Sequence, residues 1–117
     1  MNIEIARIYE HKEASDNIRI LVDRLWPRGV SKEDAHLDYW QKQWAPSEDL
    51  RKRFHQDKIS WHEFSENYKE ELNNNKKSIL EDLQEMDKRK KLILLYGSKD
   101  KSQNHAVLLK DFLGTVN

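Results

Sequence analysis

Residues 92–96, Leu-Ile-Leu-Leu-Tyr, limit the possible folds of this chain more than any other segment. Successive side chains of a strand point to opposite faces of a sheet, so a strand made only of apolar residues must be covered on both faces. Continuous apolar strands are typical of parallel sheets with helices on both sides. We therefore expect residues 92–96 to form a central strand of a layered α/β protein.

Three further segments are candidates for strands. Residues 2–8 alternate apolar and polar side chains, and residues 18–25 are nearly continuous and rich in β-branched residues. Residues 37–44 fit a strand or a helix, and we prefer the strand. Together with residues 92–96 these segments predict a mostly parallel sheet of about four strands, flanked by helices, in one α/β domain over residues 1–117.

Helix signals fill most of the remaining chain. Pro46-Ser47 begins a helix of about two turns with Ser47 as its N-cap, and Ser60 begins a longer helix as the first residue of a capping box. Residues 73–75 separate that helix from another one. A last helix follows residues 92–96, and we expect Asp100 or Ser102 to cap it and Gly114 to end it.

The composition limits the compartment and the partners. The chain has no cysteine, which excludes disulfides, thiolate metal sites and cysteine nucleophiles. The N-terminus lacks the pattern of a secretion signal, and the longest apolar run is too short to cross a bilayer. A net charge of zero gives no general attraction to nucleic acid or to an anionic membrane. We expect a cytoplasmic protein with no membrane partner, for which nucleic acid is disfavoured and a homo-oligomer stays open.

Two polar segments, residues 23–29 and 96–105, follow the predicted buried strands. Ligands of open α/β sheets bind beyond the carboxyl ends of the strands, so we expect both segments to meet at one sheet edge. If the strand continues, alternation points Asp23 and Arg24 to opposite faces. Arg24 and Arg28 flank a rigid Trp-Pro turn and form a fork suited to a carboxylate or a phosphate. For Asp23, a structural ion pair is an equally good explanation.

The second segment offers a turn and the start of a helix. Gly97 lies between a buried strand and a helix, so backbone N–H groups there can receive an anion, and Ser98 belongs to the same turn. Neither GxxxxGK nor GxGxxG is present, and Lys99 alone is better explained as a solvated side chain. The other histidines show no metal-ligand spacing and are interpreted as surface residues: His11, His36, His55 and His62. No metal site is expected, and the sequence identifies no cofactor.

His105 is the candidate for proton transfer. When residues 103–113 are wound as a helix, His105 falls within the apolar arc and in the first turn, so it should point at the sheet. Burial and the positive end of the helix both disfavour its charged form. A neutral imidazole in this position can act as a base or as a hydrogen-bond donor to a substrate. The alternative is a buried histidine with a purely structural role.

Several motifs together resemble the YeaO-like branch of the domain-of-unknown-function 488 (DUF488) family. They are Val-Asp-Arg-Leu-Trp-Pro-Arg-Gly at 22–29, Ala-Pro-Ser at 45–47, Phe64 with Tyr68, and Leu95-Tyr96 followed by Asn104-His105-Ala106. The resemblance implies a Rossmann-like fold in a bacterial protein and no particular activity. Other branches carry a Cys-His-Arg triplet where this chain has Asn104-His105-Ala106. The positions that match the family motifs are Arg24, Arg28, Asp100, Asn104 and His105.

The predicted function is a small-molecule site at the sheet edge formed by residues 23–29 and 96–105. Its ligand is expected to be an anion that bears a phosphate or a carboxylate, a class that includes nucleotides. Arg24 and Arg28 would clamp the ligand, and the turn after Gly97 would cradle it. One alternative is a non-catalytic protein-interaction module that uses the loop of residues 26–29. A second alternative is a nucleic-acid-associated protein. The sequence leaves open whether the chain is an enzyme.

Overall fold

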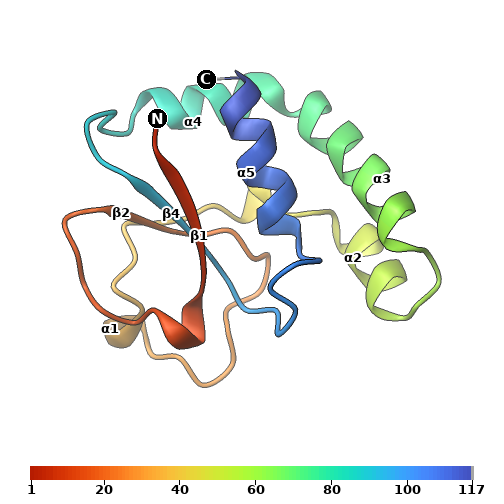
Figure 1. The fold of residues 1–117 in the computed structure, drawn as a ribbon, viewed down its shortest axis with the longest axis horizontal. Coiled ribbons are helices and arrows are strands. Elements are labelled where there is room, and N and C mark those ends of the chain that lie inside the picture. The colour runs from red at the N-terminus through yellow and green to blue at the C-terminus, as the bar shows by residue number, and fades with distance from the viewer. Residues whose placement is uncertain (117) are drawn as a thin grey trace.

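A computed structural model, which describes residues 1–116, contains a four-stranded sheet in the order β1-β4-β2-β3 (Figure 1). All three strand pairings are parallel. The strands are β1 (Ile3–Arg7), β2 (Ile18–Leu21), β3 (Tyr39–Trp40) and β4 (Leu92–Tyr96). The predicted α/β fold and the central position of residues 92–96 are therefore confirmed.

The two faces of β4 belong to two separate hydrophobic clusters. Leu92, Leu94 and Tyr96 pack into the larger cluster, whereas Ile93 and Leu95 pack into the smaller one. All five residues of β4 are buried. This alternation explains why the strand has no polar side chain on either face.

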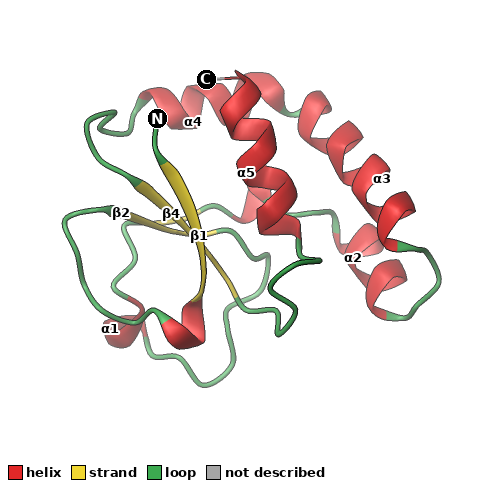
Figure 2. Cartoon of the chain, viewed as in Figure 1, coloured by secondary structure: helices red, strands yellow, loops and turns green. Residues whose placement is uncertain are grey.

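The longer helices all contribute to the larger cluster and lie on one side of the sheet (Figure 2). They are α2 (Glu48–His55), α3 (Trp61–Asn74), α4 (Lys76–Gln84) and α5 (His105–Val116). The other face is covered by loops, the short helix α1 (Lys32–Ala35) and the 3-10 turn η1 (Ile8–Glu10). Trp26 and Trp40 pack there edge to face, with ring centroids 5.3 Å apart.

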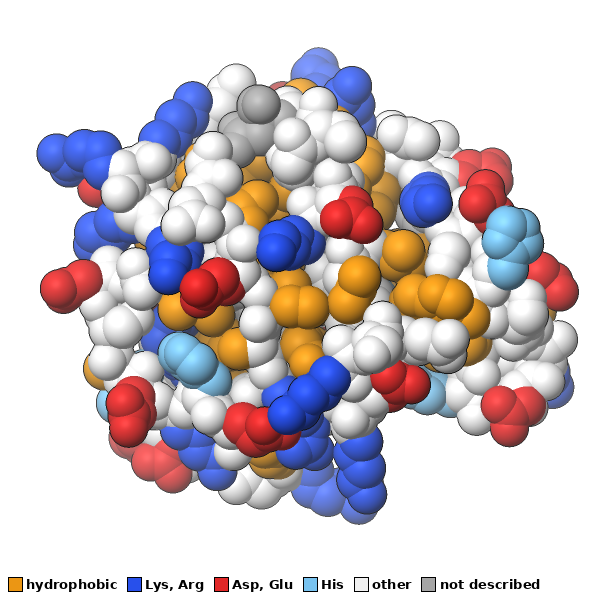
Figure 3. All heavy atoms as spheres, viewed as in Figure 1, with side chains coloured by type: hydrophobic (Ala, Val, Ile, Leu, Met, Phe, Trp, Pro, Cys, Tyr) orange, Lys and Arg blue, Asp and Glu red, His pale blue; other side chains and the backbone are white. Residues whose placement is uncertain are grey.

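The helix N-caps at Ser47 and Ser60 are confirmed. The Ser47 hydroxyl accepts a hydrogen bond from Leu50 N, and the Ser60 hydroxyl accepts one from Glu63 N. Their side chains satisfy N–H groups that no helical carbonyl can reach. Figure 3 shows charged side chains of both signs interspersed over one face of the molecule, with apolar side chains between them.

Four predicted boundaries are wrong or incomplete. β2 ends at Leu21 rather than at residue 25, and residues 37–44 divide into the two-residue strand β3 and the 3-10 turn η2 (Lys42–Trp44). Helix α5 begins at His105, because Asp100 instead accepts bonds from Ser102 N and Gln103 N in a preceding turn. It continues through Gly114, which does not adopt the positive φ of a glycine C-cap.

Within residues 1–116, no helix combines the length and the apolar composition needed to cross a membrane.

Candidate functional site

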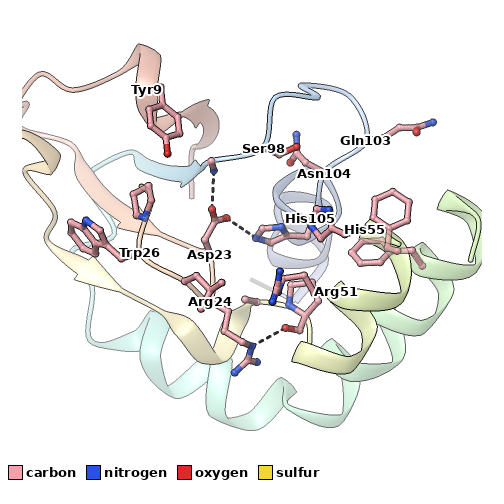
Figure 4. Close-up of a pocket in the computed structure, with 17 residues that line it drawn as sticks. Tyr9, Asp23, Arg24, Trp26, Arg51, His55, Ser98, Gln103, Asn104 and His105 are labelled. Carbon is pink, nitrogen blue, oxygen red and sulfur yellow. Dashed lines mark hydrogen bonds and ion pairs between the residues drawn. The ribbon is translucent and has the colours of Figure 1, made fainter. Parts of the chain in front are cut away.

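The two polar segments meet at the carboxyl end of the sheet, as the sequence predicted. β2 lies beside β4, and Val22 N extends their pairing by donating to Leu95 O at 3.0 Å. One residue later, Asp23 Oδ2 accepts a hydrogen bond of 2.9 Å from Gly97 N (Figure 4). A side chain of the first segment is thereby fixed to the backbone of the second.

A cavity of about 260 Å³ opens at this edge, between the sheet, α2 and the N-terminus of α5 (Figure 4). Its apolar lining comes from Tyr9, Leu25, Trp26, Pro27, Ala45, Pro46, Phe54 and Phe64. Its polar lining comes from Asp23, Arg24, Arg51, His55, Gly97, Ser98, Gln103, Asn104 and His105. An apolar hollow with a few convergent polar groups is the usual form of a small-molecule site.

Asn104 and the first turn of α5 position His105. The Asn104 side chain caps the helix, since its Oδ1 accepts from Ala106 N at 3.0 Å and from Val107 N at 3.3 Å. Its Nδ2 donates to Asp100 O at 2.9 Å, which ties the cap to the preceding turn. The residue after this cap, His105, is therefore directed at the sheet, as predicted.

Two contacts position the imidazole of His105, a hydrogen bond to Val22 and an aromatic contact with Tyr68. Its Nε2 lies 2.8 Å from Val22 O, and because a carbonyl oxygen can only accept, Nε2 carries the hydrogen. The buried ring of Tyr68 packs edge-on against it, with centroids 6.1 Å apart. Burial lowers the pKa of His105, and the nearby Asp23 carboxylate opposes this shift.

Asp23 has one oxygen bonded and one oxygen free. Oδ1 lies 3.3 Å from His105 Nε2, but the hydrogen on Nε2 is directed at Val22 O. Oδ1 is buried and has no hydrogen-bond partner within residues 1–116. Burial raises the pKa of Asp23, and the nearby His105 and the Gly97 N–H act against this rise.

Arg51 is one of the cavity residues that the sequence analysis did not single out. It lies in α2, and its Nε is the other buried side-chain atom without a hydrogen-bond partner in the described chain. Both Arg51 and His55 line the cavity, as expected of residues four apart on one face of a helix. In the sequence, the only indication that Arg51 belongs to a site was this spacing of four residues in a helix that begins just after Pro46.

The structure separates the two arginines of the predicted fork. Arg24 lines the cavity, and its Nε donates to Pro46 O at 3.0 Å. Arg28 is exposed and is not part of the lining. The chain leaves the sheet after Leu21 and turns at Gly29, whose φ is 82°, so strand alternation does not reach these residues. Asp23 and Arg24 consequently face the same cavity rather than opposite sides.

The remaining candidates divide in the same way. Gly97, Ser98 and Asn104 line the cavity, whereas Asp100 is exposed and stabilises the turn before α5. Among the residues that the structure describes, Asp23 is the only carboxylate in the lining, and no cluster there offers the ligands of a metal ion. The arrangement is suited to binding an organic molecule through hydrogen bonds and charge.

Comparisons with known proteins identify relatives along the whole chain. The model of the inactive DUF488-N3 subclade matches residues 2–116. The uncharacterized protein YeaO of Escherichia coli (strain K12) is 45% identical over 116 residues, which cover 99% of this chain and 100% of that protein. The uncharacterized protein Rv3073c of Mycobacterium tuberculosis (strain ATCC 25618 / H37Rv) is 32% identical over 111 residues, covering 95% of this chain and 92% of the relative. No solved structure gives a significant match. The chain thus belongs to the DUF488 family, in the subclade described as inactive DUF488-N3.

Proposed function

We propose that the cavity binds a small anionic molecule, with a carboxylate or a phosphate placed against Arg51 and Arg24. The observation that carries this proposal is the buried Nε of Arg51, a residue of the cavity lining, because this atom has no hydrogen-bond partner within residues 1–116. A buried donor left unpaired costs free energy. An anionic ligand would supply the missing acceptor and a charge-assisted hydrogen bond.

The charges around the cavity favour an anion. Arg24 and Arg51 are cations, and Asp23 is the opposing carboxylate. The two guanidinium groups outnumber this one carboxylate, so the local charge attracts an anion. Since Arg24 uses Nε for Pro46 O, its terminal nitrogens are left to meet a second oxygen of the same anion.

The role that we propose is binding rather than turnover. The chain has no cysteine, and its subclade is described as inactive. His105 is better explained as a positioning residue than as a catalytic base, because its Nε2 hydrogen is engaged with Val22 O and its ring lies beside Asp23. In this role His105 fixes the end of β2 and the wall of the cavity.

Thermal-shift measurements test the proposal. The probes are inorganic phosphate, benzoate and 3-phenylpropionate, each compared with sodium chloride at equal ionic strength. A ligand that binds only the native state raises the melting temperature. At a ligand concentration one hundred times Kd, the folded protein is stabilised by about 2.7 kcal/mol. At least one probe should stabilise the protein specifically.

A matched pair of variants assigns the effect to the cavity. Arg53 lies in the same helix, but its Nε is bonded to Asp49 at 3.1 Å and it does not line the cavity. The anion-dependent shift should disappear in Arg51→Met and persist in Arg53→Met. If no probe acts, or if both variants retain the shift, the proposal is wrong.

A further inference from the structure

We infer that the ligand is a zwitterion: a single α-amino acid with an apolar side chain, whose carboxylate meets Arg51 and whose ammonium meets Asp23. This inference rests on the proposed anion-binding function and adds the second group that the ligand must carry. It arises from the polarity of two unpaired atoms that belong to residues lining the cavity.

Those two atoms are of opposite kinds. Arg51 Nε is a donor that needs an acceptor, and Asp23 Oδ1 is an acceptor that needs a donor. Both residues line the same cavity. A simple anion would satisfy only the arginine and would leave Asp23 Oδ1 without a donor. A molecule with an anionic group and an N–H donor satisfies both atoms.

The environment of Asp23 favours a charged donor over a neutral one. The carboxylate is fixed by the Gly97 N–H bond to Oδ2, which leaves Oδ1 as its unpaired atom. His105 does not neutralise it, because the hydrogen on Nε2 is directed at Val22 O and burial disfavours the imidazolium. A ligand ammonium would bring both the missing hydrogen bond and the missing positive charge.

The rest of the lining fits a compact apolar body. Phe54 and Phe64 stack with ring centroids 4.6 Å apart, and both belong to the wall together with Pro46 and Trp26. Leu25 stands at the same cavity with 60% of its surface exposed. The volume of about 260 Å³ lies just below the range of about 300–1,000 Å³ that is usual for ligand pockets, which suits one amino acid better than a peptide.

Calorimetric titration with two matched ligand pairs tests the inference. L-Phenylalanine is compared with 3-phenylpropionate, and L-leucine with 4-methylpentanoate, so that each pair differs only in the ammonium group. The wild-type protein should bind at least one amino acid about tenfold or more tightly than its matched acid, as a desolvated charge pair implies. Asp23→Asn should remove this preference while leaving the affinity for the acid unchanged or higher.

The outcomes separate the two proposals. If an acid binds as tightly as its amino acid, the zwitterion inference is overturned and anion binding stands. If neither amino acids nor acids bind and phosphate has no effect, both are overturned. If Asp23→Asn keeps the preference for the amino acid, Asp23 is not the partner of the ammonium.

A second measurement covers the case in which Asp23→Asn does not fold. Titration of the wild-type protein with each ligand of a pair can be followed by amide NMR. Gly97 N–H is bonded directly to Asp23, so its resonance should move with the amino acid and much less with the acid. Equal movement with both ligands would overturn the inference.

Discussion

Replacing Arg51 with methionine should stabilise the protein while it abolishes anion binding. Methionine keeps an unbranched apolar stem and has a helix propensity close to that of arginine. The substitution therefore removes mainly the guanidinium, whose buried Nε has no hydrogen-bond partner in residues 1–116. Most substitutions destabilise proteins, so a gain here would be a specific sign that this group serves something other than folding.

The expected gain follows from two opposing contributions. Leaving a buried polar group unsatisfied costs about 1–3 kcal/mol, and this cost disappears with the guanidinium. Arg51 also attracts the Asp23 carboxylate and so lowers its pKa, but this is the smallest of the influences on that group, behind burial, His105, Gly97 and His55. We expect a net gain of about 1 kcal/mol, or a rise of about 4 °C in melting temperature for a domain of this size.

Urea denaturation, followed by tryptophan fluorescence and circular dichroism, measures this change. Arg53→Met is the control, because the Arg53 side chain is 42% exposed and its ion pair with Asp49 lies on the surface. Surface pairs of this kind contribute about 0.5 kcal/mol or less, so the control should be neutral or slightly destabilised. A loss of more than about 1 kcal/mol in Arg51→Met would show that the guanidinium supports the fold, and the reasoning would be refuted.

The contact between Asp23 and Gly97 and the state of His105 give two further predictions. In Gly97→Ala the new Cβ would lie 3.0 Å from Asp23 Oδ2, whereas a Cβ at Gly114 would meet no atom within 4 Å. Urea denaturation should therefore show that Gly97→Ala loses about 1 kcal/mol of unfolding free energy. Gly114→Ala should show no such loss. Burial keeps the pKa of His105 below its ordinary 6.5, so the unfolded chain takes up a proton first and stability should fall as the pH drops through about 6.5. The raised pKa of Asp23 acts in the opposite sense, since the folded chain keeps a proton that the unfolded chain releases above about 3.8. His105→Asn should flatten the loss between about pH 7 and pH 5, and a slope like that of the wild type would contradict the assignment.

Local signals in the sequence predicted the fold well. The apolar run of β4 required a covered central strand, and the N-caps at Ser47 and Ser60 depend only on residues within one helical turn. The end of β2 could not be predicted in this way. Trp40 Nε1 donates to Asp23 O at 2.8 Å, and this long-range bond holds backbone that the nearly continuous run of residues 18–25 had assigned to a strand.

The candidate site was predicted only where strand ends form it. Gly97 and His105 follow β4 closely, so the topology rule for parallel sheets placed them correctly. Arg51 lies on a helix, and nothing in its neighbours indicates that α2 packs beside the carboxyl end of β2. Arg28 was expected at the cavity but is not part of its lining, because the turn at Gly29 directs its side chain away. The interaction-module and nucleic-acid alternatives stay predictions.

A second buried arginine shows why the missing partner matters more than burial itself. Arg19 is only 1% exposed, yet its Nε donates to Ala35 O at 3.0 Å and its terminal nitrogens bond to Ala35 O and His11 O. This chain therefore surrounds a structural guanidinium with carbonyl oxygens, as buried polar groups generally require. Arg51 Nε and Asp23 Oδ1, by contrast, have no hydrogen-bond partner within residues 1–116, although both residues line one cavity. Because the fold satisfies Arg19 and leaves these two atoms unpaired, we attribute them to recognition of a ligand that carries both an acceptor and a donor.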